Sequence, residues 1–251
     1  EAIDAVRDCL RHRAAGLATN KARERIVGGP DMHVNTMLAA DYEACIYGFK
    51  TYTATSGIFR FFVYLYDTET NNLIAVIEAN RMGQLRTGAA TGIATSLMAR
   101  GDAVEVAILG SGSQAPAQLE SVCQVRNIQR VRVYSATQPN RERFADKMSG
   151  LLDVEVVSVE SSMKAIERAD IVVTITNSQT PVFNGDWLEP GMHVAAVGGA
   201  DPYVRELDDK AVQRADLIIV DDLSQSKIES GELMIPASKG LVSWEQMYEL
   251  W

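Results

Sequence analysis

The sequence predicts an α/β protein in which a doubly wound parallel sheet accompanies a smaller α+β domain. After Gly101, short apolar segments alternate with segments of helical period, the pattern of a parallel sheet covered by helices on both faces. Before Gly101, strand-like segments follow one another, which is typical of an antiparallel or mixed sheet. We therefore expect a first domain over residues 1–100, to which residues 226–251 return, and a second domain over residues 101–225.

The first domain is expected to begin with a helix over residues 2–17, where apolar side chains recur at helical spacing. A polar, glycine-containing stretch over residues 19–31 then leads into the sheet, and a polar turn at residues 67–72 predicts a hairpin. The expected strands are residues 32–39, 47–52, 59–66 and 73–78. Residues 86–100 are rich in small side chains and predict a helix that either packs tightly or leaves its N-terminal amides open to a ligand.

The second domain is expected to alternate strands and helices. The strands are predicted at 104–109, 131–134, 154–158, 171–175, 193–197 and 217–220, and the helices near 114–126, 139–149, 161–168 and 207–213. In such a sheet ligands bind beyond the carboxyl ends of the strands. The segments that directly follow those ends are 110–114, 135–137, 176–178 and 198–201.

A glycine turn, Gly110-Ser111-Gly112-Ser113-Gln114-Ala115, joins the first of these strands to the following helix. Gly110 permits the sharp turn, Gly112 lets a pyrophosphate approach the backbone, and Ala115 lets the helix pack closely on the sheet. The free N–H groups of the first helical turn, near Ser113 and Gln114, would face the phosphates. This Rossmann-type pattern predicts a dinucleotide site; the alternative is a tight glycine turn without a nucleotide.

Composition excludes several classes of function. A net charge of −9 argues against a nucleic-acid partner, and no apolar run approaches the length of a membrane span. Cys9, Cys45 and Cys123 form no metal or redox motif, and the histidines have no ligand spacing, so no metal site is expected. Free thiols and the absence of a signal peptide predict a cytoplasmic protein.

Ser135 follows the second strand of the Rossmann domain, where an NAD enzyme usually carries an acid for the ribose hydroxyls. A serine does not repel a 2′-phosphate, and Thr137, Arg141 and Arg143 offer further donors. The cofactor is therefore expected to be NAD or NADP, with a modest preference for NADP. The alternative for Arg141 and Arg143 is the solvated face of the next helix.

With these landmarks placed, the sequence resembles the ornithine cyclodeaminase/mu-crystallin family over nearly its whole length. The resemblance is carried by the segments YGFK at 47–50, GQLRTGAA at 83–90, GSGSQA at 110–115, LEPGMH at 188–193, RELD at 205–208 and VDD at 220–222. It implies that the first domain binds substrate and forms a homodimer, that the Rossmann domain binds NAD or NADP, and that the active site lies in the cleft between them. It also implies further residues upstream of Glu1 and past Trp251.

The resemblance assigns the substrate-binding residues. Lys50 would lie near the substrate carboxylate and the reacting carbon, and Arg86 would bind the carboxylate. The alternatives are a surface lysine and a capping or surface arginine. Arg23 matches the basic residue that follows the first helix in the family, although Arg25 competes for that role. Asn35 and Met37 would line the same pocket, and Asn35 would help to set substrate choice.

The resemblance also assigns cofactor-binding residues outside the glycine turn. Thr87 would contact the cofactor phosphates. Thr176, Asn177 and Gly198, which follow the fourth and fifth Rossmann strands, would complete the site.

One departure from the family pattern concerns an aspartate that cyclodeaminases carry after the fifth Rossmann strand. An ungapped alignment places Ala200 at that position, and Asp201 comes one residue later. Neighbouring side chains of an extended segment point to opposite sides, so this shift weakens the assignment of Asp201 as a catalytic acid. The alternative for Asp201 is a turn residue before Pro202.

The leading prediction is an NAD(P)-dependent oxidoreductase that reduces a small imino acid or oxidises the matching amino acid. Lys50 would donate the proton, with Asp201 as a second catalytic candidate. The alternatives are an ammonia lyase of the ornithine cyclodeaminase type, with tightly bound NAD, and a non-enzymatic NADP-dependent ligand-binding protein.

Overall fold

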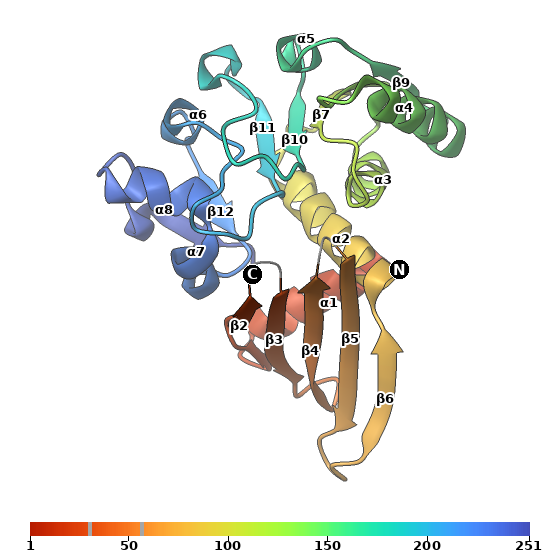
Figure 1. Ribbon diagram of the computed structural model, residues 1–251, viewed down its shortest axis with the longest axis vertical. Helices are drawn as coiled ribbons and strands as arrows, with labels where there is room; N and C mark the ends of the chain where they lie inside the picture. The colour runs from red at the N-terminus through yellow and green to blue at the C-terminus, as the bar shows by residue number, and fades with distance from the viewer. Residues whose placement is uncertain (30–31, 56–57) are drawn as a thin grey trace. The chain divides into compact units, whose positions relative to one another are not determined.

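The computed structural model describes residues 1–29, 32–55 and 58–251 (Figure 1). It divides into two compact units: unit 1 comprises residues 1–86 with Trp251, and unit 2 comprises residues 87–250. The sequence places a boundary after residue 100, whereas the contacts divide the chain inside the helix α2, Asn80–Met98. Within the segment 226–251, only Trp251 groups with unit 1.

Unit 1 is built on a six-stranded sheet with the order β1-β3-β4-β5-β6, in which β2 pairs with β3. All its strand pairs are antiparallel (Figure 1). The strands are β1 Ala18–Asn20, β2 Glu24–Gly29, β3 Met32–Asp41, β4 Ile46–Thr55, β5 Ile58–Asp67 and β6 Leu73–Glu78. The four strands expected between residues 32 and 78 are therefore present.

The prediction of a polar connection over residues 19–31 was wrong for residues 19–29, which contain β2 and most of β1, and residues 30–31 lie outside the described residues. Both strands lie beside β3, where β2 pairs Arg25 with Asn35 and Ile26 with Val34. Ile26 and Val27 stay 69% and 62% exposed, so β2 lacks the buried alternation that marks a strand in the sequence. Backbone pairing with β3 decides its conformation.

The first helix of unit 1, α1 (Ala2–Ala14), is shorter than the expected range of 2–17. Gly16 has a φ of +73°, a left-handed conformation that ends the helix. His12, in the last turn of α1, bonds through Nδ1 to the Asp41 carboxylate on β3 at 2.8 Å. This ion pair attaches the helix to the end of the strand.

Unit 2 contains a five-stranded parallel sheet with the order β11-β10-β7-β8-β9. The strands are β7 Glu105–Leu109, β8 Arg130–Tyr134, β9 Glu155–Ser158, β10 Ile171–Thr174 and β11 His193–Ala196. The helices that alternate with them are α3 Ala115–Val125, α4 Gln138–Leu152, α5 Ser162–Ile166 and α6 Asp209–Gln213, together with the short 3-10 helix η1 Gly185–Trp187. The order reverses at β7, which gives the sheet the switch point of a Rossmann-type fold.

The two faces of this sheet support separate cores. Val106 and Ile108 of β7 belong to one buried cluster, which also contains α3 and α4 side chains. Ala107 and Leu109, which alternate with them along β7, belong to a second cluster with residues of α5 and α6. Burial on both faces explains why β7 and β10 appear in the sequence as nearly continuous apolar runs, whereas β8 alternates buried valines with less buried arginines.

The segment expected as a sixth strand of the Rossmann sheet does not join it. This segment forms β12 (Ile218–Val220), which pairs in parallel with β13 (Met247–Glu249) in a separate two-stranded sheet. The helices α7 (Leu223–Glu229) and α8 (Gly231–Ser238) and the short 3-10 helix η2 (Trp244–Gln246) lie between these strands in the chain. A separate small core around Val220, Leu233 and Met247 holds this region together, which apolar periodicity alone did not reveal.

No helix among the described residues has the length and apolar character needed to cross a membrane. Cys9, Cys45 and Cys123 are free thiols.

Candidate active site

The glycine turn of unit 2 connects β7 to α3. Gly110 has a φ of +118°, and a Cβ at this position would lie 2.2 Å from the Ile175 carbonyl oxygen. A Cβ at Gly112 would meet no atom within 4 Å. The packing of the chain itself therefore requires glycine at position 110. Gly112 instead leaves open space beside the backbone, which fits the approach of a pyrophosphate.

The first turn of α3 offers an anion-binding end. The helix begins at Ala115 with proline in its first turn, and its N-cap residue Gln114 makes no side-chain capping bond. The Ala115 N–H closes the turn by donating to the Gly112 carbonyl at 3.1 Å. Ser113 is exposed beside it. A helix start of this kind attracts phosphate through its N–H groups and its dipole.

The end of β8 lies next to the glycine turn. The hydroxyls of Ser111 and Ser135 are 2.8 Å apart, which links the two loops. Arg141 donates to the Ser135 carbonyl at 2.9 Å, and its guanidinium lies 5.6 Å from the centre of the Tyr134 ring. Arg141 is therefore held against the end of β8, whereas Arg143 bonds to Asn140 on its own helix. Thr137 is the N-cap residue of α4, and its carbonyl accepts from Ser135 at 3.4 Å.

The ends of β10 and β11 bring Thr176 and Gly198 close together. The two strands are in register, with Thr174 opposite Ala196, so the residues that follow them emerge at the same edge of the sheet. The Thr176 and Gly198 N–H groups both donate to the Glu206 carboxylate, at 2.6 and 2.8 Å. Asn177 is exposed next to Thr176.

In unit 1, the predicted residues Asn35, Met37 and Lys50 lie on one face of the sheet, and Arg23, just before β2, reaches the same face. Met37 of β3 is directly opposite Lys50 of β4, and Asn35 is opposite Tyr52. The Lys50 Nζ lies 5.5 Å from the centre of the Tyr52 ring, and the Arg23 guanidinium lies 5.7 Å from the same ring. Two cations therefore share one aromatic ring, an arrangement that stabilises positive charge.

Asn35 is 2% exposed and accepts a hydrogen bond from the Nε of Arg25 at 3.0 Å. Arg23 and Arg25, the two candidates for the family's basic residue after the first helix, thus have different positions. Arg23 lies over Tyr52 with Lys50, and Arg25 orients the Asn35 amide.

Arg86 and Thr87 do not lie at the start of a helix, as the sequence predicted. Arg86 was expected to open a helix, but α2 already begins at Asn80, so both residues lie in its interior. The Asn80 side chain accepts from the Phe61 N–H at 3.2 Å and fixes the start of the helix there. The N-terminal amides of α2 are therefore not beside Arg86, and any anion binding by Arg86 rests on its guanidinium.

Asp201 has the geometry of a turn residue. Its Oδ1 accepts the Tyr203 N–H at 2.9 Å, a bond to the backbone two residues ahead. Its backbone forms an isolated parallel bridge with Ser230. The carboxylate thus contributes to the shape of the loop that follows β11.

The sequence did not identify Tyr52 and Glu206 as residues of the site. Tyr52 lies two residues after Lys50 on the same strand, so strand alternation would have placed it on the same face. Glu206 was noted only as part of a motif, although it is 1% exposed and bonds to the ends of two strands. Its role depends on contacts with Thr176 and Gly198 that no local pattern reveals.

Two buried groups outside the predicted set have shifted pKa values. Burial raises the pKa of Glu232, on α8, to about 7. Burial also lowers the pKa of His193, at the start of β11, to about 4. His193 lies at the amino end of its strand, away from the edge where ligands of this fold bind.

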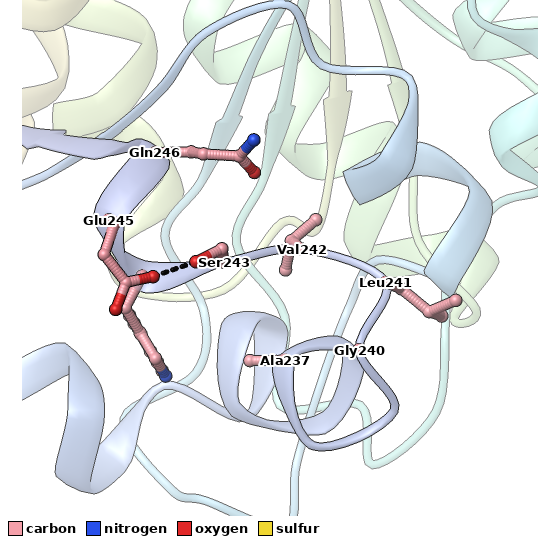
Figure 2. Close-up of a pocket in the computed structure, with 8 residues that line it drawn as sticks. Ala237, Gly240, Leu241, Val242, Ser243, Glu245 and Gln246 are labelled. Atoms are coloured by element: carbon pink, nitrogen blue, oxygen red, sulfur yellow. Dashed lines mark hydrogen bonds between the residues drawn. The ribbon is translucent and has the colours of Figure 1, made fainter.

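A pocket of about 560 Å³ lies on the C-terminal region and is lined by Ala237 and residues 240–246. Figure 2 shows Ser243 bonded to the Glu245 carboxylate within it. None of the predicted site residues lines this pocket, and we assign no function to it.

Two curated proteins show the similarity of this chain to known sequences. Mouse (Mus musculus) ketimine reductase mu-crystallin is 36% identical over 148 residues, which cover 59% of this chain and 46% of the relative. Delta(1)-pyrroline-2-carboxylate reductase from Bacillus cereus is 35% identical over 179 residues, covering 71% of this chain and 55% of the relative. The chain spans about half the length of the curated relatives it matches.

A solved structure resembles the fold of the whole chain. Delta(1)-pyrroline-2-carboxylate reductase from Thermococcus litoralis, in complex with NADH and L-proline, has a TM-score of 0.95 and 31% identity, covering 100% of this chain and 80% of that chain. A family model for ornithine cyclodeaminase/mu-crystallin proteins matches residues 1–251. With the Rossmann-type sheet and the glycine turn in place, this chain belongs to the ornithine cyclodeaminase/mu-crystallin family.

Proposed function

We propose that this protein is an NAD(P)-dependent oxidoreductase that reduces a small imino acid or oxidises the matching amino acid. The observation that carries the proposal is the group formed by Arg23, Lys50, Tyr52 and the buried Asn35 on one face of the unit 1 sheet. Two cations beside an amide suit a small substrate with a carboxylate and a nitrogen. The similarity to pyrroline-2-carboxylate and ketimine reductases supports the same substrate class.

In this proposal Lys50 and Arg86 hold the substrate carboxylate. Reduction of an imine requires a hydride at carbon and a proton at nitrogen, and the bound nicotinamide supplies the hydride. The Lys50 ammonium donates the proton, while Arg23 adds positive charge above the same ring. Met37, opposite Lys50, and Asn35 shape the space for the substrate side chain.

The cofactor would bind at the strand ends of unit 2. The open space at Gly112 and the first turn of α3, with Gly110, Ser113 and Gln114, fit the pyrophosphate. Thr87 would contact the phosphates, as the family resemblance implies. Thr176, Asn177 and Gly198 would bind the nicotinamide half.

The end of β8 supports binding of NADP as well as NAD. Ser135 and Thr137 offer hydroxyl groups in the loop that follows β8, and Arg141 donates to the Ser135 carbonyl in the same loop. A guanidinium at this place favours a 2′-phosphate, because it forms charge-assisted hydrogen bonds with phosphate oxygens. We therefore propose a modest preference for NADP.

The two alternative functions can be separated by the fate of the cofactor. The protein would be mixed with NADPH or NADH and with pyrroline-2-carboxylate, or with keto acids and ammonia or methylamine, while nicotinamide absorbance is followed. A lasting fall in absorbance with one of these imines is the expected result. Ammonia release from ornithine without a net change would favour the lyase, and cofactor binding without any turnover would favour a binding protein.

The geometry of Asp201 bears on the lyase alternative. Its bond to the Tyr203 N–H supports the role of a turn residue. We expect Asp201→Asn, which keeps an oxygen acceptor for that bond, and Asp201→Ala to retain imine reduction within about threefold. Loss of turnover in both variants, with an unchanged melting temperature, would instead identify Asp201 as a catalytic acid.

We also propose that unit 1 forms a homodimer through the sheet face opposite Lys50. On this face Tyr47 stacks on Tyr66, and Phe49 stacks on Tyr64, with ring centres 5.1 and 4.6 Å apart. Leu38 and Val76 lie on the same face and are 52% and 51% exposed. Exposed apolar patches commonly mark protein interfaces. Light scattering of the purified protein should give the mass of two chains, and a Leu38→Glu variant should give the mass of one.

A further inference from the structure

The Glu206 carboxylate is a buried acceptor at the ligand-binding edge of the Rossmann sheet. Its residue is 1% exposed, and it accepts hydrogen bonds from the Thr174 hydroxyl at 2.8 Å, the Thr176 N–H at 2.6 Å and the Gly198 N–H at 2.8 Å. All three donors are neutral. Transfer of a charged carboxylate from water to the protein interior costs free energy, and hydrogen bonds from backbone N–H groups offset that cost.

These donors lie at the carboxyl ends of neighbouring strands. Thr174 ends β10, Thr176 follows it, and Gly198 follows β11. In a doubly wound sheet each half of the strand order serves one nucleotide of a dinucleotide. The glycine turn after β7 and Ser135 after β8 belong to the adenosine and pyrophosphate side. The carboxyl ends of β10 and β11 therefore form the part of the site that would bind the nicotinamide nucleotide.

We propose that Glu206 is a positioning residue for the nicotinamide half of the cofactor site, because it fixes the backbone at the ends of β10 and β11. The inference rests on the proposed function, since it assumes that a nicotinamide dinucleotide binds at this edge. Glu206 acts through Thr176 and Gly198, which would contact the cofactor.

The geometry requires a carboxylate and not an amide. The Thr176 N–H bonds to Oε1 of Glu206, and the Gly198 N–H bonds to Oε2. A glutamine has one acceptor oxygen, so its NH₂ group would face one of these two N–H donors. Gly198 itself is fitted to the carboxylate, since a Cβ there would lie 2.4 Å from Oε2.

The backbone of Glu206 is held in turn by Glu232 at the start of α8. The Glu232 carboxylate is 7% exposed and accepts from the N–H groups of Glu206 and of Leu207, the latter at 2.9 Å. Gly231 permits this contact, because a Cβ there would lie 2.2 Å from the Val204 carbonyl oxygen. The position of the Glu206 carboxylate is thus set by a second buried carboxylate and by close backbone packing.

The test compares a ligand that has the nicotinamide ring with one that lacks it. The affinities of NADH and of ADP-ribose would be measured by calorimetry for the wild-type protein and for Glu206→Gln. We expect NADH binding to weaken by about tenfold or more, while ADP-ribose binding changes by less than about twofold. A merely structural role would not change the ratio of the two affinities.

Asp170 provides a matched control at the opposite edge of the sheet. It precedes β10, and its Oδ2 accepts from the N–H groups of Val104 and Glu105 at 2.9 and 3.0 Å. Asp170 also pairs with the Arg100 guanidinium through Oδ1. Asp170→Asn removes the charge from a carboxylate that likewise accepts from two backbone N–H groups, without touching the ligand-binding edge. This variant should leave the ratio of NADH to ADP-ribose affinity unchanged.

If Glu206→Gln does not fold, Thr174→Val removes only the hydroxyl donor and should shift the same ratio in the same direction. A wild-type ratio in the folded variant, or an equal loss for both ligands, would overturn the role of Glu206. A wild-type protein that binds neither ligand nor their 2′-phosphorylated forms would overturn the proposed function instead.

Discussion

The two units hold their candidate functional groups by different means. In unit 2 the groups are backbone atoms and small side chains at the ends of buried strands, such as β10, whose four residues Ile171–Thr174 are all buried. In unit 1 the groups are long side chains in the middle of strands, such as Lys50 on β4 and Met37 on β3. Binding by backbone atoms requires positions without a Cβ, so that a ligand can approach the chain. Binding by side chains requires that the residues project from the same face of the sheet.

This difference determines which kind of substitution abolishes ligand binding in each unit. An added side chain in the glycine turn would exclude a ligand without removing any group that binds it. Truncation of a side chain in unit 1 would remove the binding group and leave the backbone intact. We test this contrast first through ligand binding and catalysis, from the largest expected effect to the smallest, and then through stability.

The largest effect on cofactor affinity is expected from Gly112→Val. A side chain at this position would fill the space that is open in the structure, and the chain itself would meet no clash at its Cβ. We expect NAD(P)H affinity to fall by roughly a hundredfold or more, about 3 kcal/mol, with little change in melting temperature. Calorimetry and thermal unfolding check this outcome. Gly101→Val is the control, because a Cβ at Gly101 also meets no atom within 4 Å. Unchanged cofactor affinity in Gly112→Val would refute the site.

The variant Lys50→Met tests the substrate-binding side chains of unit 1. Loss of a charged hydrogen bond to a buried carboxylate costs about 2–5 kcal/mol, or about one to four decades in kcat/KM. Because Lys50 is also the proposed proton donor, kcat should fall and excess substrate should not restore it. Arg86→Met should mainly raise KM, since Arg86 only binds the carboxylate.

Steady-state kinetics on one accepted substrate distinguish these variants, with exposed Lys21→Met as the control for loss of a surface charge. A Lys50→Met enzyme with a wild-type kcat would show that Lys50 is not the proton donor.

The cofactor preference is tested by Ser135→Asp. A carboxylate at this position would repel a 2′-phosphate and accept from ribose hydroxyls, so the ratio of NADPH to NADH affinity should fall by about tenfold. Ser135→Asn, which adds similar bulk without charge, should change this ratio much less. A wild-type protein that already prefers NADH strongly would contradict our interpretation of this position.

The last prediction concerns the stability of unit 2 and the carboxyl group of Glu232. Its pKa is raised by burial to about 7, and the neighbouring Glu206 carboxylate also raises it, while the N–H donors of Glu206 and Leu207 and the charge of Arg205 lower it. The unfolded chain loses this proton near the ordinary value of 4.5. Between these two pH values the folded state binds more protons, so the free energy of unfolding should fall as pH rises.

Glu232→Gln should remove this part of the pH dependence, which is on the order of 2 kcal/mol between about pH 5 and about pH 8. Urea unfolding at several pH values measures the difference between the two proteins. The His12–Asp41 pair of unit 1 also titrates, with the pKa of His12 raised by its bond to Asp41, but it is common to both proteins and cancels in the difference. An identical pH slope in wild type and variant would exclude Glu232 as its source.

The sequence by itself determined the Rossmann-type sheet and the glycine turn. Strands such as β7 and β10 are buried on both faces and form continuous apolar runs. The turn requires glycine at position 110, and Gly112 leaves open space for a ligand, so the glycine pattern can be recognised in the sequence. The strands of unit 1 from residue 32 onward were also predicted, because their length and aromatic content mark them.

Only the tertiary structure decided the remaining features. Whether β2 is a strand depends on pairing with β3, and whether β12 joins the main sheet depends on β13, which lies far along the chain. The start of α2 depends on the Asn80–Phe61 contact, and the role of Glu206 depends on N–H groups in the loops that follow two strands. Each of these outcomes is set by a contact between segments distant in sequence, and local propensity is too weak to fix such contacts in advance.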